Sequence, residues 1–259
     1  MVVEDPSGEY KKGTKVATMV GGMARSINGS YAEYINIPKG NTIPFESGLP
    51  WNELAAIPES YGTAWALLNW CLDAREGEVI LIHGGTSTVG MAAVILAKQL
   101  GMKVIATTRS ARKEPLLKAL GADEVVIDTS KISDKLKAQS VDKVIELIGT
   151  TSLADTLKSI RPMGSIVLAG FLGGLEPLES FHPIFQLPNG IRLTALASTF
   201  IFGQKGFEYS KIPLQKIISD IEAGNIPNIL RATFPAEEIA EAHRAAESGE
   251  VNGKVVVQW

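Results

Sequence analysis

A glycine-rich turn is the part of the sequence whose residue types and spacing most clearly predict chemistry. It reads Gly84-Gly85-Thr86-Ser87-Thr88-Val89-Gly90 and follows the apolar run 79–83 directly. Gly84 allows a sharp turn, and Gly90 allows the helix expected at 89–100 to pack closely on the strand. Free N–H groups at the start of such a helix, together with its dipole, hold a pyrophosphate. We therefore predict that a nucleotide binds through its phosphates at Gly84, Thr86, Ser87, Thr88, Val89 and Gly90.

The end of the next strand indicates which nucleotide binds. A site for NAD usually presents a carboxylate there for the ribose hydroxyls, whereas the 2′-phosphate of NADPH requires positive charge. The stretch 103–111 contains no acidic residue. The guanidinium of Arg109 can hold a phosphate through two hydrogen bonds. We predict an NADPH site that includes Arg109, Ser110 and Lys113, and the structural alternative is a solvated basic helix start.

The elements that must position these residues follow a strand–helix repeat. Expected strands cover 79–83, 103–107, 125–127, 143–147 and 165–169, and the expected helices between them cover 89–100, 113–120, 134–139 and 153–160. Strands that are apolar on both faces and alternate with helices are typical of a doubly wound parallel sheet. The glycine-rich turn departs from a full G-x-G-x-x-G. The prediction of a nucleotide site therefore depends on the position of the turn between a strand and a helix of this repeat.

The flanking segments have a different pattern. Strands are expected at 15–20 and 30–37 around a turn at Asn28-Gly29, followed by a linker over 39–50 and a helix over 59–70. After the fifth strand of the repeat we expect an irregular loop over 172–190 and a strand over 191–197. Helices over 214–222 and 235–248 and a strand over 254–258 complete the chain.

Composition excludes several classes of protein. The chain has 259 residues, 45% of them apolar and 20% charged, and a net charge of −3 that gives no reason to expect nucleic acid as a partner. No apolar run is long enough to cross a bilayer, so no membrane partner is expected. The single cysteine, Cys71, cannot form an internal disulfide, which favours the reducing cytoplasm.

Several stretches, taken in order, resemble the zinc-independent quinone oxidoreductase branch of the medium-chain dehydrogenase/reductase superfamily. The matching stretches cover almost the whole chain and are 29–34, 61–65, 84–90, 120–123 and 252–256. The resemblance implies an α/β fold with a partial GroES-like β-rich catalytic domain at 1–58 and an NADPH-binding Rossmann domain at 59–200. It also implies that the segment 201–259 completes the Rossmann domain and returns to the catalytic domain.

The resemblance implies further site residues and a reaction. NADPH would transfer hydride to a quinone or to an activated C=C or carbonyl group, with Tyr61 and Thr63 as the candidates for direct chemistry. The nicotinamide ring would lie at the ends of the fourth and fifth strands, beside Gly149, Gly170 and Phe171. Asn252 and Lys254 would approach the cofactor from the C-terminal segment. Two subunits would join along the strand 191–197 as a homodimer.

A catalytic zinc is not expected. Such a site needs about three Cys, His or carboxylate ligands, and the chain has one cysteine and three histidines with no ligand pair. In the zinc-dependent alcohol dehydrogenases a cysteine ligand lies four residues before the threonine that matches Thr63, and Glu59 occupies that position here. His83, at the end of its strand, is more often a satisfied core histidine than a base.

Two rival functions stay open at this stage. Members of the family normally have a longer N-terminal portion, so the chain could bind a nucleotide with little turnover because its catalytic domain is incomplete. In that case its first residues would be readily cleaved by proteases. An alcohol dehydrogenase is the second alternative.

Overall fold

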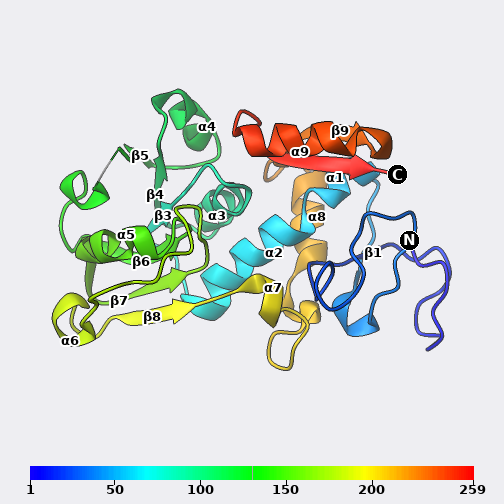
Figure 1. Cartoon of the computed structure of the whole chain (residues 1–259), viewed down its shortest axis with the longest axis horizontal. Helices are drawn as coiled ribbons and strands as arrows, with labels where there is room; N and C mark the ends of the chain where they lie inside the picture. Colours follow the sequence, from blue (N-terminus) through cyan, green and yellow to red (C-terminus); the bar gives the residue numbers. More distant parts are fainter. Residues whose placement is uncertain (130) are drawn as a thin grey trace. The chain divides into compact units, whose positions relative to one another are not determined.

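The computed structural model describes residues 1–129 and 131–259, with the side chains of all of these except 199 and 200. They form two compact units (Figure 1). The sheet unit comprises Thr63–Ala197, and the terminal unit comprises Met1–Gly62 and Ser198–Trp259. No helix among the described residues is both long and apolar enough to cross a membrane.

A six-stranded parallel sheet is the framework of the sheet unit. Its strands in spatial order are β5 (Glu124–Ile127), β4 (Lys103–Thr108), β3 (Val79–His83), β6 (Val141–Glu146), β7 (Ile160–Leu168) and β8 (Arg192–Ala195). Counted from β3, this order is 3-2-1-4-5-6, the order of the Rossmann fold. The winding direction reverses between β3 and β6. Ligands of such sheets bind outside the carboxyl ends of the two strands at this reversal.

The short helix α6 (Pro183–Gln186) lies between β7 and β8, inside the stretch predicted as an irregular loop. Three other helices connect strands of the sheet unit and agree with the predicted repeat. They are α3 (Thr88–Gln99), α4 (Glu114–Ala119) and α5 (Thr150–Thr156). Helix α3 buries every residue from Gly90 to Ala97, because small alanines alternate with larger apolar residues there. The predicted α/β fold class is confirmed.

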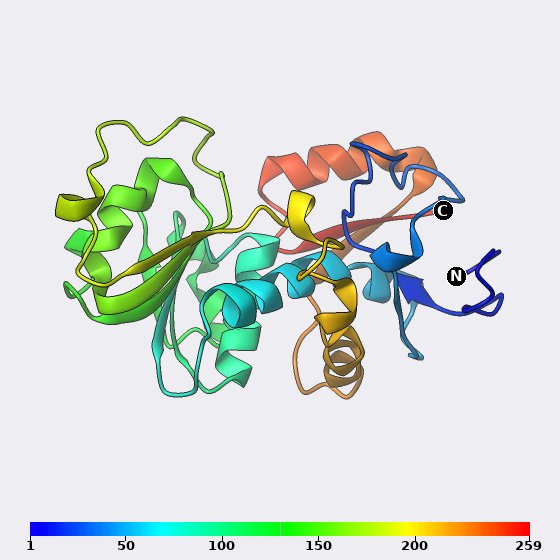
Figure 2. The same cartoon turned by 90° about the horizontal axis from the view of Figure 1, so that it is seen from below.

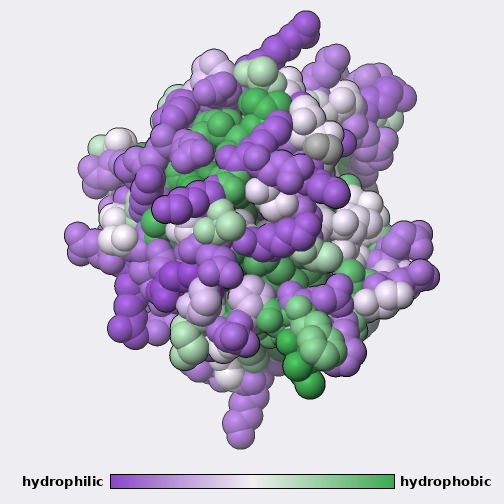
Figure 3. All heavy atoms as spheres, turned by 90° about the vertical axis from the view of Figure 1, so that its left-hand side faces the viewer, coloured by the Kyte–Doolittle hydropathy of each residue, from purple (hydrophilic) through white to green (hydrophobic). Residues whose placement is uncertain are grey.

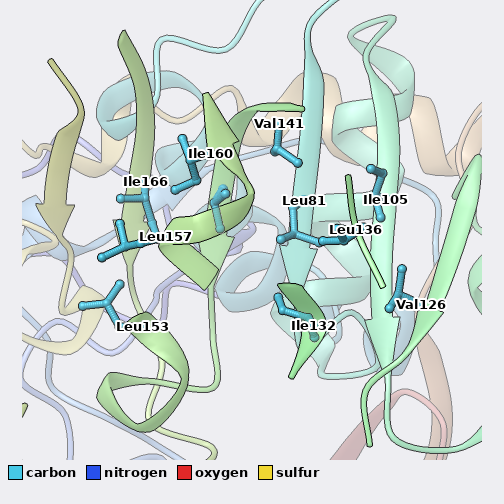
Figure 4. Packing of buried hydrophobic residues seen from close by; sticks show 11 residues of the cluster. Leu81, Ile105, Val126, Ile132, Leu136, Val141, Leu153, Leu157, Ile160 and Ile166 are labelled. Carbon is cyan, nitrogen blue, oxygen red and sulfur yellow. The ribbon is translucent and has the colours of Figure 1, made fainter. Parts of the chain in front are cut away.

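The core on one side of the sheet forms where apolar residues of neighbouring strands meet α5 (Figure 4). Its members are Leu81, Ile105, Val126, Ile132, Leu136, Val141, Val144, Leu153, Leu157, Ile160 and Ile166. Each of these side chains is at most 8% exposed. Burial of this kind contributes about 1.5 to 3 kcal/mol for each large apolar side chain, which fixes the strands that carry the site.

The terminal unit contains two small sheets and several helices. Strand β1 (Val16–Ala17) pairs antiparallel with β2 (Ile43–Pro44). Strands β9 (Leu230–Pro235) and β10 (Lys254–Gln258) pair in parallel, and α9 (Ile239–Ser248) connects them and lies beside them in Figures 1 and 2. The remaining helices are α1 (Trp51–Ala55), α7 (Ser198–Ile201) and α8 (Leu214–Glu222). Helix α2 (Pro58–Ala66) runs from this unit into the sheet unit.

Some predicted elements are wrong, and each error has a physical reason. Residues 30–37, all described, form no strand, and Tyr31 and Tyr34 are 65% and 73% exposed because no neighbouring strand covers them. The turn lies at 22–27 rather than at Asn28-Gly29. No α-helix forms at 134–139, all described, and only a 3₁₀ turn, Ile132–Asp134, lies at the start of this stretch. Within 134–139 only Leu136 is buried, so the stretch has no apolar face to hold a helix against the core. Strand β9 was not predicted.

Candidate cofactor site

The glycine-rich turn joins β3 to α3 at the point where the winding of the sheet reverses. Gly84 has a positive φ of 94°, which a residue with a side chain rarely adopts. Its N–H donates to Thr107 Oγ1 over 3.0 Å, and the N–H of Gly85 donates to the Thr107 carbonyl over 3.0 Å. Strand β4 therefore holds the turn in place.

The start of α3 explains why a serine stands in the middle of the turn. Ser87 is the N-cap: its Oγ accepts from the N–H of Gly90 and donates to the carbonyl of Gly84, each over 3.0 Å. A Cβ at Gly90 would lie 2.3 Å from the Gly84 carbonyl oxygen, so only glycine fits. Thr86, Thr88 and Val89 are half-buried around this helix start. Amides of a first helical turn have no partner within the helix, and they suit a phosphate.

The end of β4 brings together the three residues predicted to select the cofactor. Thr108 Oγ1 accepts from the N–H of Ser110 over 3.2 Å, and the N–H of Lys113 donates to the Ser110 carbonyl over 3.0 Å. Arg109 is exposed, while Ser110 and Lys113 are half-buried. Arg112 also lies in this turn, so three cations stand directly after β4, where a 2′-phosphate would lie.

The ends of β6 and β7 approach each other through two glycines. A Cβ at Gly170 would lie 2.2 Å from the Leu147 carbonyl oxygen, and one at Gly149 would lie 3.2 Å from the Gly170 carbonyl oxygen. The backbone of Phe171 is equally near Gly149, but its side chain is 66% exposed. The structure thus brings the predicted residues Gly149, Gly170 and Phe171 together. The two glycines thus let the backbone segments at the ends of β6 and β7 pack closely against each other.

A buried polar network connects the ends of β3, β5 and β6. His83 Nδ1 lies 2.8 Å from Glu146 Oε2, and His83 Nε2 lies 3.1 Å from Asp128 Oδ2. His83 and Glu146 are 2% and 0% exposed. Burial by itself lowers the pKa of His83, but its hydrogen bonds and charge interactions with Glu146 and Asp128 outweigh burial and raise that pKa. The expectation of a satisfied core histidine is confirmed.

Sequence analysis did not find the carboxylate partners in this network. One signal was available, because Glu146 ends a strand whose other residues near that end are apolar. An acidic residue in such a strand is either paired or functional, since an isolated buried charge is very costly. Asp128 gave no such signal, because it follows the third strand in a polar stretch.

The remaining predicted site residues divide between the units. Thr63 is 5% exposed in the sheet unit, and Tyr61 is fully buried in the terminal unit. The Tyr61 hydroxyl donates to the Pro227 carbonyl, and burial raises the pKa of this tyrosine. The one hydroxyl proton of Tyr61 is thus donated within the terminal unit, and direct chemistry by Tyr61 or Thr63 stays a prediction.

Asn252 and Lys254 lie in the terminal unit at the start of β10. Burial lowers the pKa of Lys254, and the Glu59 carboxylate partly opposes that shift. The side-chain oxygen of Asn252 is buried and accepts no hydrogen bond from the described residues. Asn252 therefore has a polar atom that a bound molecule could satisfy.

No metal-binding cluster is visible in the described part of the chain, which holds no group of three His, Cys, Asp or Glu side chains suited to an ion. Glu59, at the position of a zinc ligand in the zinc-dependent alcohol dehydrogenases, instead interacts with Lys254 and Tyr209. The expectation of a zinc-free site stays a prediction.

Known proteins resemble this chain over most of its length. The family model of the zinc-binding dehydrogenases matches residues 88–200. Quinone oxidoreductase of Rattus norvegicus is 28% identical over 93% of this chain and 71% of its own. Acryloyl-coenzyme A reductase of Sulfurisphaera tokodaii is 27% identical over 92% of this chain and 67% of its own.

A solved structure of an NAD-dependent alcohol dehydrogenase is also similar. It is 32% identical over 89% of this chain and 65% of its own, with a TM-score of 0.72. The chain belongs to the medium-chain dehydrogenase/reductase superfamily, in its quinone oxidoreductase-like branch. Members of this branch are oxidoreductase enzymes, and the chain is one of them.

Proposed function

We propose that the chain is an NADPH-dependent oxidoreductase that transfers hydride to a quinone or to an activated C=C or carbonyl group. The observation that carries the proposal is the phosphate turn at Gly84–Gly90, which lies between β3 and α3 where the winding of the sheet reverses. The relatives named for quinone and acryloyl-coenzyme A reduction support the two substrate classes.

The preference for NADPH rests on charge at the end of β4. Arg109 and Lys113 stand in the turn after that strand, and the stretch 103–111 contains no carboxylate that would bind ribose hydroxyls. The cofactor would supply the hydride, and the protein would supply position and charge. Gly84, Ser87 and Gly90 would shape the turn in which Thr86, Thr88 and Val89 hold the pyrophosphate, and the nicotinamide would lie beside Gly149 and Gly170.

Cofactor titration and a substrate panel test this proposal. NADPH and NADH are titrated separately against the purified chain, with binding followed by nicotinamide fluorescence. Turnover is then measured with quinones, enones and primary alcohols. We expect tighter binding of NADPH and turnover of quinones or enones. Tighter binding of NADH, with oxidation of alcohols, would instead support the alcohol dehydrogenase reading, which the 32% identity to such an enzyme keeps open.

We also propose that the chain forms a homodimer, that it is located in the cytoplasm, and that its domain boundaries lie at 58 and 200. Strand β8 is an edge of the sheet, and Leu193 on it is 40% exposed. Figure 3 shows apolar patches on the face that lies at the left in Figure 1. An open apolar edge invites pairing with a second copy of the chain.

The proposed cytoplasmic location fits the properties of Cys71. Burial raises the pKa of this cysteine to about 11, so its thiol stays protonated and unreactive.

A further inference from the structure

The buried network around His83 stands beside the cofactor site and has a role that the proposed function does not yet include. His83 precedes the phosphate turn directly, and it pairs in register with Glu146 across β3 and β6. These are the two strands at whose carboxyl ends the winding reverses. Any movement of this pair would therefore reach both sides of the crevice in which a nucleotide is expected.

Glu146 fixes the backbone that follows β6. Its Oε1 accepts from the N–H of Ile148 over 2.8 Å and from the N–H of Gly149 over 3.3 Å. Its Oε2 accepts from Thr156 Oγ1 over 2.7 Å and faces His83 Nδ1. One carboxylate thus holds the turn that contains Gly149. The φ of Gly149 is 120°. Glycine can adopt this φ but also many others, so the hydrogen bonds from Glu146 are needed to fix it.

His83 must carry two protons to satisfy both of its neighbours. Each ring nitrogen faces a carboxylate oxygen, and only the imidazolium donates from both nitrogens. The titratable groups that face it are Glu146 on β6 and Asp128 after β5, and Thr156 on α5 adds a neutral hydroxyl 3.2 Å from Nδ1. Loss of the second proton would leave one carboxylate opposite a bare ring nitrogen in a buried place. Such an arrangement is strongly unfavourable.

We propose that Glu146, held by the protonated ring of His83, is a positioning residue that shapes the turn 147–149 for the nicotinamide cofactor. This inference rests on the proposed function, because it assigns Glu146 a role in binding that cofactor. The consequence is that cofactor affinity depends on the protonation of His83. No proton passes to the substrate from this network, and its residues act only through the backbone they hold.

Two substitutions at one position separate the parts of the proposal. Glu146→Gln keeps an oxygen for the amides of Ile148 and Gly149 but presents an NH₂ group to His83, so the ring becomes neutral. Glu146→Ala removes the acceptor of the turn altogether. Asp128→Asn is the matched control, because it replaces the other carboxylate that faces the ring by a neutral amide and leaves the turn 147–149 with its acceptor.

The readouts are the dissociation constant of NADPH between pH 7 and 9.5, ligand-free thermal stability, and the ¹⁵N shifts of the His83 ring, assigned with His83→Gln. In the wild type we expect both ring nitrogens protonated at pH 7, and NADPH affinity falling about fivefold or more as the ring loses its proton. Glu146→Ala should weaken NADPH about tenfold or more, because the turn loses its geometry. Glu146→Gln should bind NADPH at nearly wild-type strength, and its NADPH affinity should not change between pH 7 and 9.5. We expect the same result for Asp128→Asn.

Three results would overturn the inference. The first is a singly protonated His83 ring at pH 7 in the wild type. The second is wild-type NADPH affinity in Glu146→Ala, and the third is an unchanged pH profile in Glu146→Gln. If the wild type binds neither NADPH nor NADH, the proposed function fails and this inference fails with it. The Glu146→Ala and Glu146→Gln results, by contrast, can refute the positioning role while the proposed function stands.

Discussion

Arg109→Ala is the substitution whose effect on cofactor choice follows most directly from the structure. Arg109 is an exposed cation in the turn after β4, and the stretch around it has no acidic residue. A charge-assisted hydrogen bond to a phosphate contributes about 1.5 to 3 kcal/mol. Since each 1.4 kcal/mol corresponds to about a tenfold change in affinity, loss of the contact should weaken NADPH about ten- to a hundred-fold. Exposure to water places the expected value near the lower end of that range.

The affinity for NADH should hardly change, because NADH has no 2′-phosphate. Arg112→Ala is the matched control: Arg112 is also exposed and lies in the 3₁₀ turn Ala111–Lys113, but it is not one of the predicted ligands. Fluorescence titration of both cofactors at low and high salt provides the measurement, and salt should reduce the NADPH advantage of the wild type. Equal losses for NADPH and NADH, or an equal effect of Arg112→Ala, would refute the assignment of Arg109.

Three further outcomes are expected. Elemental analysis should find zinc well below one atom per chain, and chelators should leave any reductase activity intact; one tightly bound zinc per chain would contradict this. Leu193→Lys on the edge strand β8 should convert a dimer into a monomer in sedimentation experiments, because a charge on an edge opposes pairing; a monomeric wild type would refute the dimer. Gly90→Ala should destabilise the chain by about 1 to 3 kcal/mol and weaken NADPH, because its Cβ would lie 2.3 Å from the Gly84 carbonyl oxygen; unchanged unfolding and binding curves would contradict the packing.

Sequence patterns predicted the sheet unit well because its strands are buried on both faces. The run at 79–83 is apolar except for its last residue, His83, and it became β3 with the predicted bounds. Helix α8 also matched its prediction, since Leu214, Ile217, Ile218 and Ile221 repeat at helical spacing and all are buried. The local sequence pattern was sufficient to predict an element wherever its apolar residues repeat with the period of that element and are all buried.

Prediction failed where structure depends on partners distant in the sequence. Strand β9 alternates half-buried and exposed residues, and its pairing partner β10 lies about twenty residues further on. The same limit hid the network at the site. His83 and Glu146 are 63 residues apart, and only the parallel register of β3 and β6 places them opposite each other. The phosphate turn was found because its glycine spacing is local in the sequence, although two of its hydrogen bonds reach Thr107 on β4.

Tyr61→Phe tests which of two roles this tyrosine has. Its hydroxyl donates to the Pro227 carbonyl, and the side chain is fully buried within the terminal unit. Removal of one hydrogen bond costs about 0.5 to 1.5 kcal/mol, which in a chain of this size lowers Tm by a few degrees. A structural tyrosine therefore predicts a lower Tm and an unchanged kcat.

A proton donor predicts the opposite pattern for Tyr61→Phe. Loss of general acid catalysis typically lowers the rate by about 10² to 10⁴, without any need for a change in Tm. Tyr209→Phe is the control, because Tyr209 is an equally buried tyrosine of the same unit that was not predicted to act on substrate. We expect Tyr61→Phe to lose stability, and we expect both variants to keep kcat. A fall in kcat of about a hundredfold in Tyr61→Phe alone would restore Tyr61 as the proton donor, and the hydrogen bond to Pro227 would then have to open during turnover.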